Sequence, residues 1–342
     1  MPSTSSRKKD HIDLCLDEDV RHRAKRSGLE RYELVHNALP EIDLDDVDTR
    51  VPFLGRTLSM PLIVNSMTGG YEEAERINRE LAQTCEAEGL ALGLGSQRQA
   101  LESTTHHESW RAARRAAPSI PIFGNIGAPE IARGVPTDAI ARLVDMIEAD
   151  GFAIHLNPLQ ELMQPEGSPR FRGALDGIAR LVRELPVPVI VKEVGAGLSA
   201  DVVRRLLDVG VRHVDISGAG GTSWSGVELL RSEERERDDP FWDWGIPTAE
   251  AIVAARPLCE AAGATLIASG GIAQSRDLPI ALALGAHAVA SARPMLTALR
   301  DGGVDGLREL VATWRRHLRY AMFLTGSVDV AALRVAALRH SG

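Results

Sequence analysis

Short runs of consecutive apolar residues recur along the chain, and each ends at a glycine or at a polar residue. The eight runs cover residues 62–65, 90–95, 120–125, 152–155, 187–192, 213–217, 265–269 and 286–291. Runs of this length without polar alternation are typical of strands that are buried on both faces of a parallel sheet. The pattern therefore predicts eight buried parallel strands.

Segments with helical periodicity, such as residues 74–88 and 137–149, alternate with these runs. Most runs start about 30 residues after the previous one, which is the length of one strand–helix–strand unit. Eight such units predict an α/β fold of the (β/α)8 TIM-barrel type, whose active site lies at the carboxyl ends of the strands.

Two segments fall outside this repeat. Residues 1–50 precede the first run and are predicted to form an N-terminal arm, and residues 222–245 form an insertion after the sixth run. A connection of this length in a compact domain is typical of a lid or of a disordered excursion. Because 342 residues, 44% of them hydrophobic, suffice for one barrel core, we expect a single domain over residues 1–342.

Composition narrows the class of protein. The net charge of −8 argues against nonspecific binding of nucleic acid, which needs a basic face. No apolar run approaches the ~18 residues of a membrane span, and the first residues lack the pattern of a signal peptide. Three cysteines in dispersed positions, Cys15, Cys85 and Cys259, suggest neither a disulfide framework nor a metal cluster. We therefore expect a cytoplasmic protein.

The residues that follow the first two strands suit a flat or anionic ligand. Met67-Thr68-Gly69-Gly70 follows the first strand and lets a ring or an anion approach the backbone closely. A glycine pair at such a position is, however, more often only a turn. Gly95-Ser96-Gln97-Arg98 follows the second strand, and its arginine could equally form a surface ion pair.

The fourth and fifth strands end in the most reactive side chains. His155, Asn157, Gln160 and Glu161 follow the fourth strand within seven positions, although a lone histidine there is more often a core residue than a catalyst. Lys192 ends the fifth strand, and a buried ammonium without a negative partner is costly. Lys192 is therefore predicted to face the barrel mouth.

Small residues follow the last three strands. These segments are Ser217-Gly218-Ala219-Gly220-Gly221-Thr222, Ser269-Gly270-Gly271 and Ser291-Ala292-Arg293. Loops at the seventh and eighth strands of such barrels commonly hold a phosphate. Together with Lys192 and the Met-Thr-Gly-Gly turn, they describe a site for a flat phosphorylated cofactor, for which FMN is the natural candidate. The basic segment at residues 7–11 reads, on composition alone, as a disordered tail.

With these motifs assembled, the chain resembles the type 2, FMN-dependent isopentenyl diphosphate isomerases over nearly its whole length. The matching segments are Arg7, Lys8 and His11 of the arm, residues 67–70, 95–98, 155–167, 191–195, 218–224, 244–248 and 322–326. Individually some of these matches are weak, but their order along the chain is that of the family.

The resemblance implies a role for each matched residue. FMN would contact Met67, Thr68, Gly69, Ser96, Asn125, Lys192, Ser217 and Thr222, with Gly270, Gly271, Ser291 and Ala292 near its phosphate. The substrate would contact Arg7, Lys8, His11, Arg98, His155, Asn157 and Gln160. Glu161 would hold Mg2+, and Gln160, Lys192 and His155 would act in catalysis. The resemblance thus favours an ordered arm over a disordered tail.

The implied reaction moves a double bond by a proton shift, from isopentenyl to dimethylallyl diphosphate, with no net redox change. We hypothesise that reduced FMN acts as the acid and base, while Lys192 stabilises negative charge at the N1/O2 edge of the flavin. Gln160 would orient the alkene or relay a proton, and His155 would bind the diphosphate. NADPH or a reduced flavin donor would reduce the cofactor, and related proteins form homotetramers or homo-octamers.

The chain departs from the family pattern in two places. Ser168 replaces a frequent acidic residue, and the segment 290–293 is bulkier than the glycine-containing segment usual after the eighth strand. Both departures bear on phosphate contacts and leave the fold expectation unchanged.

Two other functions remain open from the sequence. One is an FMN-dependent dehydrogenase or oxidase of a small hydroxy acid, but no His-x-x-Arg pair follows the sixth strand. No cysteine lies at a strand end either, which argues against the thioimidate chemistry of nucleotide dehydrogenases. The other is a flavin or prenyl-phosphate binder without activity, against which Arg98, Gln160 and Glu161 weigh.

Overall fold

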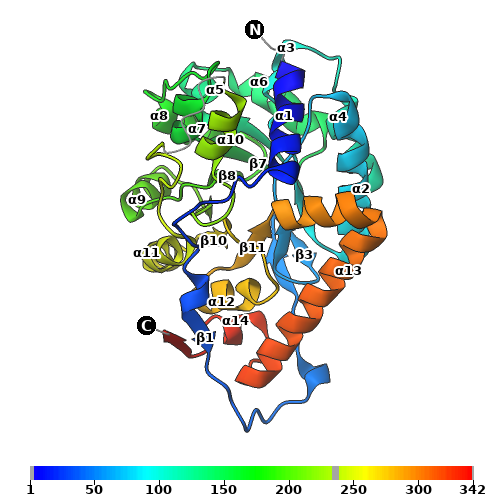
Figure 1. Cartoon of the computed structure of the whole chain (residues 1–342), viewed down its shortest axis with the longest axis vertical. Helices are drawn as coiled ribbons and strands as arrows, with labels where there is room; N and C mark the ends of the chain where they lie inside the picture. The colour runs from blue at the N-terminus through cyan, green and yellow to red at the C-terminus, as the bar shows by residue number, and fades with distance from the viewer. Residues whose placement is uncertain (1–3, 233–238, 341–342) are drawn as a thin grey trace.

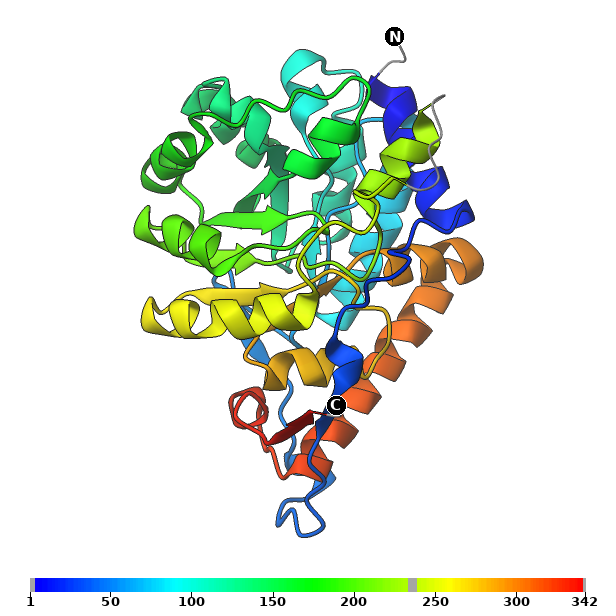
Figure 2. The same cartoon turned by 60° about the vertical axis from the view of Figure 1, so that its left-hand side comes forward.

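The structure is a computed structural model that describes residues 4–232 and 239–340. Eight parallel strands close into a barrel (Figures 1 and 2), as the apolar runs predict. They are β4 (Leu62–Val64), β5 (Ala91–Gly93), β6 (Ile122–Gly127), β7 (Gly151–Leu156), β8 (Val189–Glu193), β9 (His213–Asp215), β10 (Thr265–Ala268) and β11 (Ala288–Ser291). Each predicted run overlaps one strand, with boundaries that differ by one or two residues at most ends.

Helices cover the outside of the barrel or lie at its mouth. They are α2 (Glu72–Glu88), α3 (Arg98–Glu102), α4 (Glu108–Ala116), α5 (Ala128–Ala132), α6 (Thr137–Met146), α7 (Pro158–Met163), α8 (Ala174–Glu184), α9 (Ala200–Asp208), α10 (Trp224–Arg231), α11 (Thr248–Ala261), α12 (Asp277–Ala283), α13 (Arg293–Thr325) and α14 (Val330–Leu333). Helices α7 and α10 are those that lie at the mouth. The predicted helices at 74–88 and 137–149 correspond to α2 and α6. All three cysteines are free, and Cys85 and Cys259 are buried.

Strand register brings functional residues to one level of the barrel. His155 of β7 pairs with Lys192 of β8, and Lys192 in turn pairs with Asp215 of β9. Because parallel strands end at the same edge, these three residues lie side by side where the barrel opens.

The predicted N-terminal arm is ordered throughout its described part. It contains α1 (Thr4–Asp17), the short 3-10 helices η1 (Leu29–Arg31) and η2 (Leu44–Asp46), and strand β1 (Tyr32–Leu34), which pairs with β12 (Leu338–His340). The strands β2 (Val51–Phe53) and β3 (Arg56–Leu58) form a hairpin after it. Helix α1 lies against α10 and α13 at the barrel mouth (Figure 1), so the interpretation as a disordered tail is wrong for the described residues.

The insertion after the sixth barrel strand is not an irregular loop over its described part. Ser223 accepts a hydrogen bond from the N–H of Gly226 and starts helix α10, which runs to Arg231. Thr222, at the start of the insertion, forms an isolated bridge with Arg21 of the arm. Residues 233–238 of the predicted insertion lie outside the described residues. The insertion and the arm therefore pack together as neighbours.

A buried ion pair closes the opposite, amino-terminal end of the barrel. Asp150 accepts hydrogen bonds from Arg114 at 2.6 Å and from Arg56 at 2.7 Å, and also from the N–H of Ile122. Arg114 is only 8% exposed and donates to several loop carbonyls as well. This end of the barrel is therefore held by structural charges, and the chemistry is left to the other end.

Candidate active site

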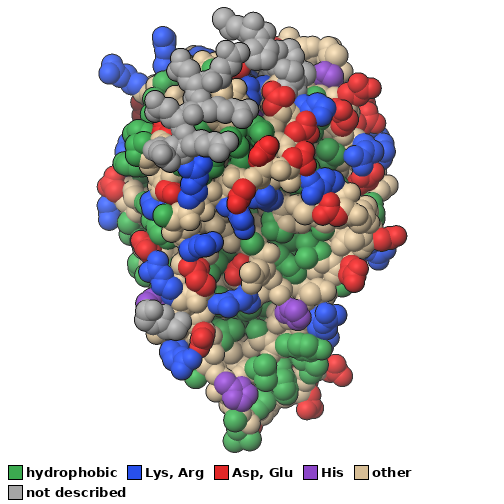
Figure 3. Space-filling view, viewed as in Figure 1, with side chains coloured by type: hydrophobic (Ala, Val, Ile, Leu, Met, Phe, Trp, Pro, Cys, Tyr) green, Lys and Arg blue, Asp and Glu red, His purple; other side chains and the backbone are tan. Residues whose placement is uncertain are grey.

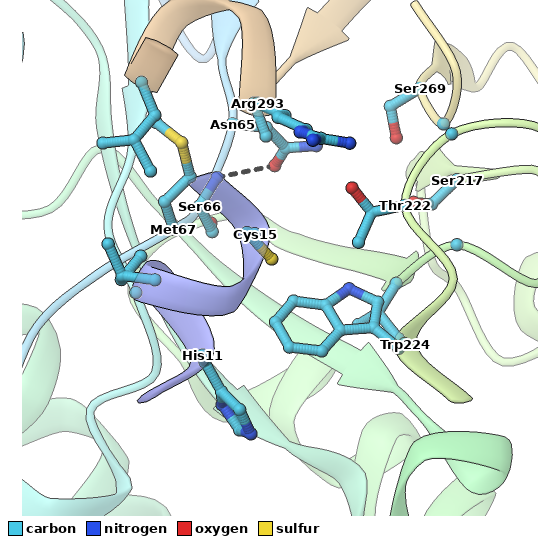
Figure 4. A pocket seen from close by; sticks show the side chains of 18 of the residues that line it. His11, Cys15, Asn65, Ser66, Met67, Ser217, Thr222, Trp224, Ser269 and Arg293 are labelled. Atoms are coloured by element: carbon cyan, nitrogen blue, oxygen red, sulfur yellow. Dashed lines mark hydrogen bonds between the residues drawn. The ribbon is translucent and has the colours of Figure 1, made fainter. Parts of the chain in front are cut away.

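One cavity of about 990 Å3 lies at the carboxyl ends of the barrel strands, beneath α1. It brings together every residue for which the sequence predicts a role. Those residues are Arg7, Lys8, His11, Met67, Thr68, Gly69, Ser96, Arg98, Asn125, His155, Asn157, Gln160, Glu161, Lys192, Ser217, Thr222, Gly270, Gly271, Ser291 and Ala292. Figure 4 shows part of this wall, with His11 and Trp224 facing each other from α1 and α10.

The loops after β9 and β10 form a cradle that only glycine permits. A Cβ on Gly221 would lie 2.5 Å from the backbone nitrogen of Gly271, and Gly270 and Gly271 both have positive φ, at 88° and 69°. The two loops therefore pack directly against each other, and their glycines present main-chain atoms to the cavity, where an anion or a sugar chain could approach them. The loop after β10, the seventh barrel strand, lies where a TIM barrel commonly holds phosphate.

Lys192 provides a cation at the cavity floor. Its side chain is almost fully buried and its ammonium donates to the carbonyl of Glu193 at 2.6 Å. The Glu193 carboxylate turns away from the cavity and accepts hydrogen bonds from the backbone N–H groups of residues 194–197. Burial nevertheless raises the pKa of Glu193 to about 7. Glu193 therefore shapes the loop beside Lys192 rather than pairing with it.

His155 is held as a neutral imidazole. Its Nδ1 lies 2.6 Å from Oδ1 of Asn125, and because an amide oxygen only accepts, Nδ1 carries the proton. Burial, together with the charges of Lys192 and Lys8, lowers the pKa of His155 to about 3. Nε2 is thus left with a lone pair in the unliganded protein.

A hydrogen-bonded chain of amides leads from β7 to α10. Asn157 donates to Oε1 of Gln160 at 2.7 Å, and Nε2 of Gln160 donates to Gln164 and, at 2.7 Å, to Glu228. Every polar group of the Gln160 side chain is engaged, so the plane of its amide is fixed. His11 of α1 reaches the same Glu228 oxygen at 2.9 Å.

Glu161 is buried beside this chain. One of its oxygens accepts from Asn157 at 3.2 Å and the other accepts from the N–H of Ser168 at 2.7 Å. Ser168, a departure from the family pattern, thus holds Glu161 through its backbone N–H, which any residue type except proline could do. Within the described residues, no group of three or more His, Cys, Asp or Glu side chains could hold a metal by itself.

Three cations gather at the other side of the cavity. Lys8 donates to the carbonyl of Ser96 at 2.7 Å and lies 5.0 Å from the ring centre of Trp110. Burial and the neighbouring charges of Arg7 and Arg98 lower the pKa of Lys8 to about 7. Burial and Arg98 also lower the pKa of Arg7. Crowded, desolvated cations of this kind suit a ligand with several negative charges.

Arg98 satisfies both interpretations drawn from the sequence. It lines the cavity, and it also forms ion pairs with Glu130 at 3.2 Å and Glu102 at 3.6 Å. Burial raises the pKa of Glu130 despite the charges of Arg98 and Arg133. The paired arginine is therefore oriented toward the cavity before any ligand arrives.

Sequence reasoning missed three charged residues that support the site, namely Glu130, Glu228 and Arg231. Glu228 is fully buried, and although burial opposes its ionisation, bonds from His11 and Gln160 and the charge of Arg231 lower its pKa. Arg231 binds Glu228 at 2.6 Å and Glu166 at 3.2 Å. The spacing of Glu228 and Arg231, three residues apart after an N-capping serine, was a signal of a helix within the insertion.

The cavity fits FMN on features of the structure itself. The glycine cradle would accept the phosphate and ribityl chain, and Lys192 supplies a buried cation at the floor. Within the described residues, Ser66 Oγ and Asn157 Oδ1 are buried in the cavity wall without a hydrogen-bond partner. Buried polar atoms of this kind call for a ligand or water. Lys192, Thr68, Ser96 and Asn125 would hold the ring, and Gly270, Gly271, Ser291 and Ala292 would hold the phosphate.

Comparison with solved structures agrees on the fold. A crystal structure of mandelate oxidase with (S)-2-phenylpropionate superposes with a TM-score of 0.66 at 20% identity, covering 98% of this chain and 97% of that chain. Mandelate oxidase with benzoyl-formic acid gives the same TM-score at 19% identity, over 97% and 94% of the two chains. At this level of identity the likeness concerns the barrel alone.

Sequence comparison is more specific. The family described as FMN-dependent dehydrogenase matches residues 3–117 and 147–340. Isopentenyl-diphosphate delta-isomerase of Chlorobium phaeovibrioides is 48% identical, covering 97% of this chain and 96% of that protein. The proteins of the same name from Chlorobaculum parvum and Nostoc sp. are 46% and 43% identical, covering 97% and 99% of this chain and 96% and 95% of theirs. The chain belongs to the FMN-dependent dehydrogenase family and, within it, to the isopentenyl-diphosphate delta-isomerases.

Proposed function

We propose that this protein interconverts isopentenyl and dimethylallyl diphosphate by a proton shift assisted by reduced FMN, with no net redox change. The observation that carries the proposal is a single cavity that joins a flavin-sized floor, built around Lys192, to a cluster of three cations, Arg7, Lys8 and Arg98. A hydroxy acid would need far less positive charge than a diphosphate. Relatives at 43–48% identity that carry this name support the proposal.

Reduced FMN would supply the electron density and the acid–base group that protonation of an unactivated alkene requires. Lys192 would hold negative charge at the pyrimidine edge of the ring. The covered floor would exclude water from the developing cationic carbon, which would otherwise be trapped by hydration. At the end of β8, Lys192 thus provides positive charge, and Glu193 holds the conformation of the loop beside it.

Arg7, Lys8 and Arg98 would bind the diphosphate by charge-assisted hydrogen bonds, worth roughly 1.5–3 kcal/mol each. The lone pair on Nε2 of His155 makes it an acceptor in the free protein, so it would contact the diphosphate after taking up a proton. His11 of α1 would assist through Glu228. The cluster would thus neutralise most of the ligand charge inside an acidic protein.

We propose Mg2+ as a second cofactor, bound by Glu161 together with the diphosphate. Magnesium commonly uses one or two carboxylates, substrate phosphates and several waters rather than an all-protein cage. A single buried carboxylate, already oriented by Asn157 and Ser168, is suited to that arrangement.

Gln160 would orient the alkene or relay a proton. Its amide is fully engaged by Asn157, Gln164 and Glu228, so contact with substrate would exchange one of these bonds. Because an amide does not titrate, Glu228, which accepts a hydrogen bond from Gln160, could gain or lose the proton that Gln160 relays.

We also propose NADPH as the reductant of the flavin, a cytoplasmic location, and closure of the arm together with the insertion when substrate binds. Free buried thiols at Cys85 and Cys259 support a reducing compartment. In the described part of the chain, no helix is long and apolar enough to cross a bilayer.

Protection of residues 4–17 from limited proteolysis by saturating substrate would support closure of the arm, and unchanged cleavage would refute it.

The decisive experiment is an anaerobic assay with FMN, Mg2+ and isopentenyl diphosphate, run with oxidised and then with chemically reduced flavin. Dimethylallyl diphosphate formed only with reduced flavin would establish the proposed isomerase. Bound flavin without product in either state would refute it and would favour a hydroxy-acid oxidoreductase or an inactive binder.

A further inference from the structure

Asp215, the last residue of β9, is a buried carboxylate for which the reaction above has no use. It is 3% exposed and does not line the cavity, but it lies directly behind residues that do. An ionised carboxylate in such a place is costly unless it is paired and hydrogen-bonded. Burial raises its pKa, and the charge of Lys192 opposes that rise.

The hydrogen bonds of Asp215 reach three separate strand ends. Ser269, after β10, donates its hydroxyl to Oδ1 at 2.5 Å, and Asn65, after β4, donates its amide to Oδ2 at 3.3 Å. The N–H of Ser217 donates to Oδ1 at 3.2 Å. All three donors belong to residues that line the cavity (Figure 4).

Two of these bonds, those of Ser269 and Ser217, change what the cavity presents to a ligand. Because Ser269 gives its hydroxyl hydrogen to Asp215, it offers only lone pairs to the cavity and suits a hydroxyl donor such as a ribityl group. Ser217 has a φ of 34°, which is a strained conformation for a residue with a side chain. The bond from its N–H to Asp215 helps to hold that conformation at the edge of the phosphate cradle.

The charge of Asp215 also faces Lys192. The two residues are register partners on β8 and β9, and the Lys192 ammonium is bonded to a carbonyl rather than to a carboxylate at close range. An anion one strand away would therefore offset part of the positive field that Lys192 exerts on the ring.

We propose that Asp215 is a positioning residue for the flavin. It orders the ends of β4, β9 and β10 from behind the cavity floor, and it balances the charge of Lys192. The proposal rests on the flavin site but not on the isomerase reaction, so its test uses no substrate.

The test is Asp215→Asn, examined by titration of the apoprotein with FMN and by the midpoint potential of the bound flavin. An asparagine cannot accept from all three donors, so we expect the dissociation constant for FMN to rise at least tenfold. Loss of a negative charge favours the anionic reduced ring, so we expect the potential to become more positive. Wild-type affinity and potential in folded Asp215→Asn would overturn the proposal.

The matched control is Asp150→Asn, which removes a carboxylate that also accepts hydrogen bonds from three residues, two of them arginines, at the opposite end of the barrel. It should lower thermal stability and leave the affinity for FMN within twofold of wild type. An equal loss of FMN affinity in this control would also overturn the proposal, because the effect would then be general destabilisation.

If Asp215→Asn does not fold, Ser269→Ala tests the same arrangement. This variant keeps the carboxylate but removes the hydroxyl that Asp215 orients. We expect weaker FMN binding with an unchanged midpoint potential. Binding as tight as in the wild type would overturn the proposal.

Discussion

Two ionisable side chains of the cavity, His155 and Lys8, have pKa values well below those that they would have in water. His155 stays neutral because burial and two lysines disfavour its cation, whereas Lys8 sits near the midpoint of its titration at neutral pH. A polyanionic ligand would reverse both influences, since it supplies the missing negative charge. Binding of a diphosphate should therefore be coupled to uptake of protons.

Lys8 provides a direct test of this coupling. With a pKa of about 7, it is largely neutral at pH 8 in the free protein, and a bound diphosphate would raise that pKa. We therefore expect proton uptake on binding at pH 8, and an affinity that falls by up to about tenfold per pH unit above pH 7. Calorimetry in two buffers of different ionisation enthalpy measures the uptake.

The matched variant for this prediction is Lys8→Arg, which keeps a positive charge that does not titrate near neutrality. Proton uptake at pH 8 should fall in Lys8→Arg, while uptake that arises from His155 remains. Equal uptake in the wild type and in Lys8→Arg would contradict the assignment to Lys8.

Lys192→Met tests the role of the floor cation. The side chains are similar in length, so the variant removes the charge and its hydrogen bond with little change in volume. We expect the midpoint potential of bound flavin to become more negative, and turnover to fall by about 10²–10³-fold, as when one donor to a developing charge is removed. Absorbance spectra during anaerobic reduction, followed by product assay, measure both; an unchanged potential and rate would refute the role.

At this scale the sequence indicates which residues face the cavity, because parallel strands bring their carboxyl ends to one edge. His155, Lys192 and Ser217 could be located in this way. Asp215 could not be assigned a role, although it lies in a predicted strand, because its partners Asn65 and Ser269 are distant in sequence. A buried carboxylate is recognised by its donors, and their convergence is a property of the closed barrel.

At the scale of whole elements, α1 and α10 form one cover over the cavity. Arg231, whose side chain is 6% exposed, ties them together through Glu228 and Glu166 at the distances given above and through Asp10 of α1 at 3.9 Å. Asp10 belongs to the arm, Glu166 follows α7, and Glu228 belongs to α10. A single guanidinium thus joins three segments that are far apart in the sequence.

Arg231→Met should loosen this cover. The variant leaves the buried carboxylate of Glu228 with only His11 and Gln160 as partners. Breaking a buried ion pair by removing one partner typically costs about 3–5 kcal/mol. We expect faster hydrogen exchange in residues 4–17 and a fall in turnover of about tenfold or more, with FMN affinity near that of wild type. Mass spectrometry measures the rate of hydrogen exchange in residues 4–17 directly.

Arg204→Met on α9 is the control, because Arg204 forms an exposed ion pair with Asp201 at 3.3 Å. Such surface pairs contribute little to stability. Exchange in residues 4–17 that is equally slow in Arg231→Met and in Arg204→Met would show that the arginine does not hold the cover.

The sequence predicted the strands of the barrel better than it predicted helices α1 and α10, which form the cover. Barrel strands carry a local signal in the sequence, a short apolar run followed by a polar residue. Each run was sufficient to predict its own strand. Helix α10 is only eight residues long and lies in a segment whose length indicates an irregular loop. Its helical structure is stabilised by contacts with α1 and α7, and contacts of that kind are set by the tertiary fold.

At the scale of the whole molecule, apolar side chains that do not line the cavity gather at the lower end of the view in Figure 3. We call this group the lower patch. It consists of Val35, Leu39, Tyr320, Leu324, Val328 and Val335, all more than 40% exposed. Backbone hydrogen bonds between residues 35 and 337 and between 37 and 324 hold its segments together. Contiguous apolar groups on a protein surface commonly mark an interface.

We propose that the lower patch mediates the homo-oligomer, a tetramer or an octamer, that the family resemblance implies. Leu39 and Val335 are its most exposed members, at 72% and 74%. The double variant Leu39→Glu, Val335→Glu would place like charges in the interface, and we expect light scattering after gel filtration to give a lower mass than for the wild type. Such repulsion in a desolvated interface costs several kcal/mol.

Val253→Glu on α11 changes an apolar residue that is 49% exposed and lies outside the lower patch, so it should leave the mass unchanged. A monomeric wild type, or a double variant with the wild-type mass, would refute an interface at this end. Because no residue of the lower patch lines the cavity, the double variant should retain wild-type FMN affinity. A lower oligomer mass together with wild-type flavin binding would therefore show that assembly does not depend on the site at the barrel mouth.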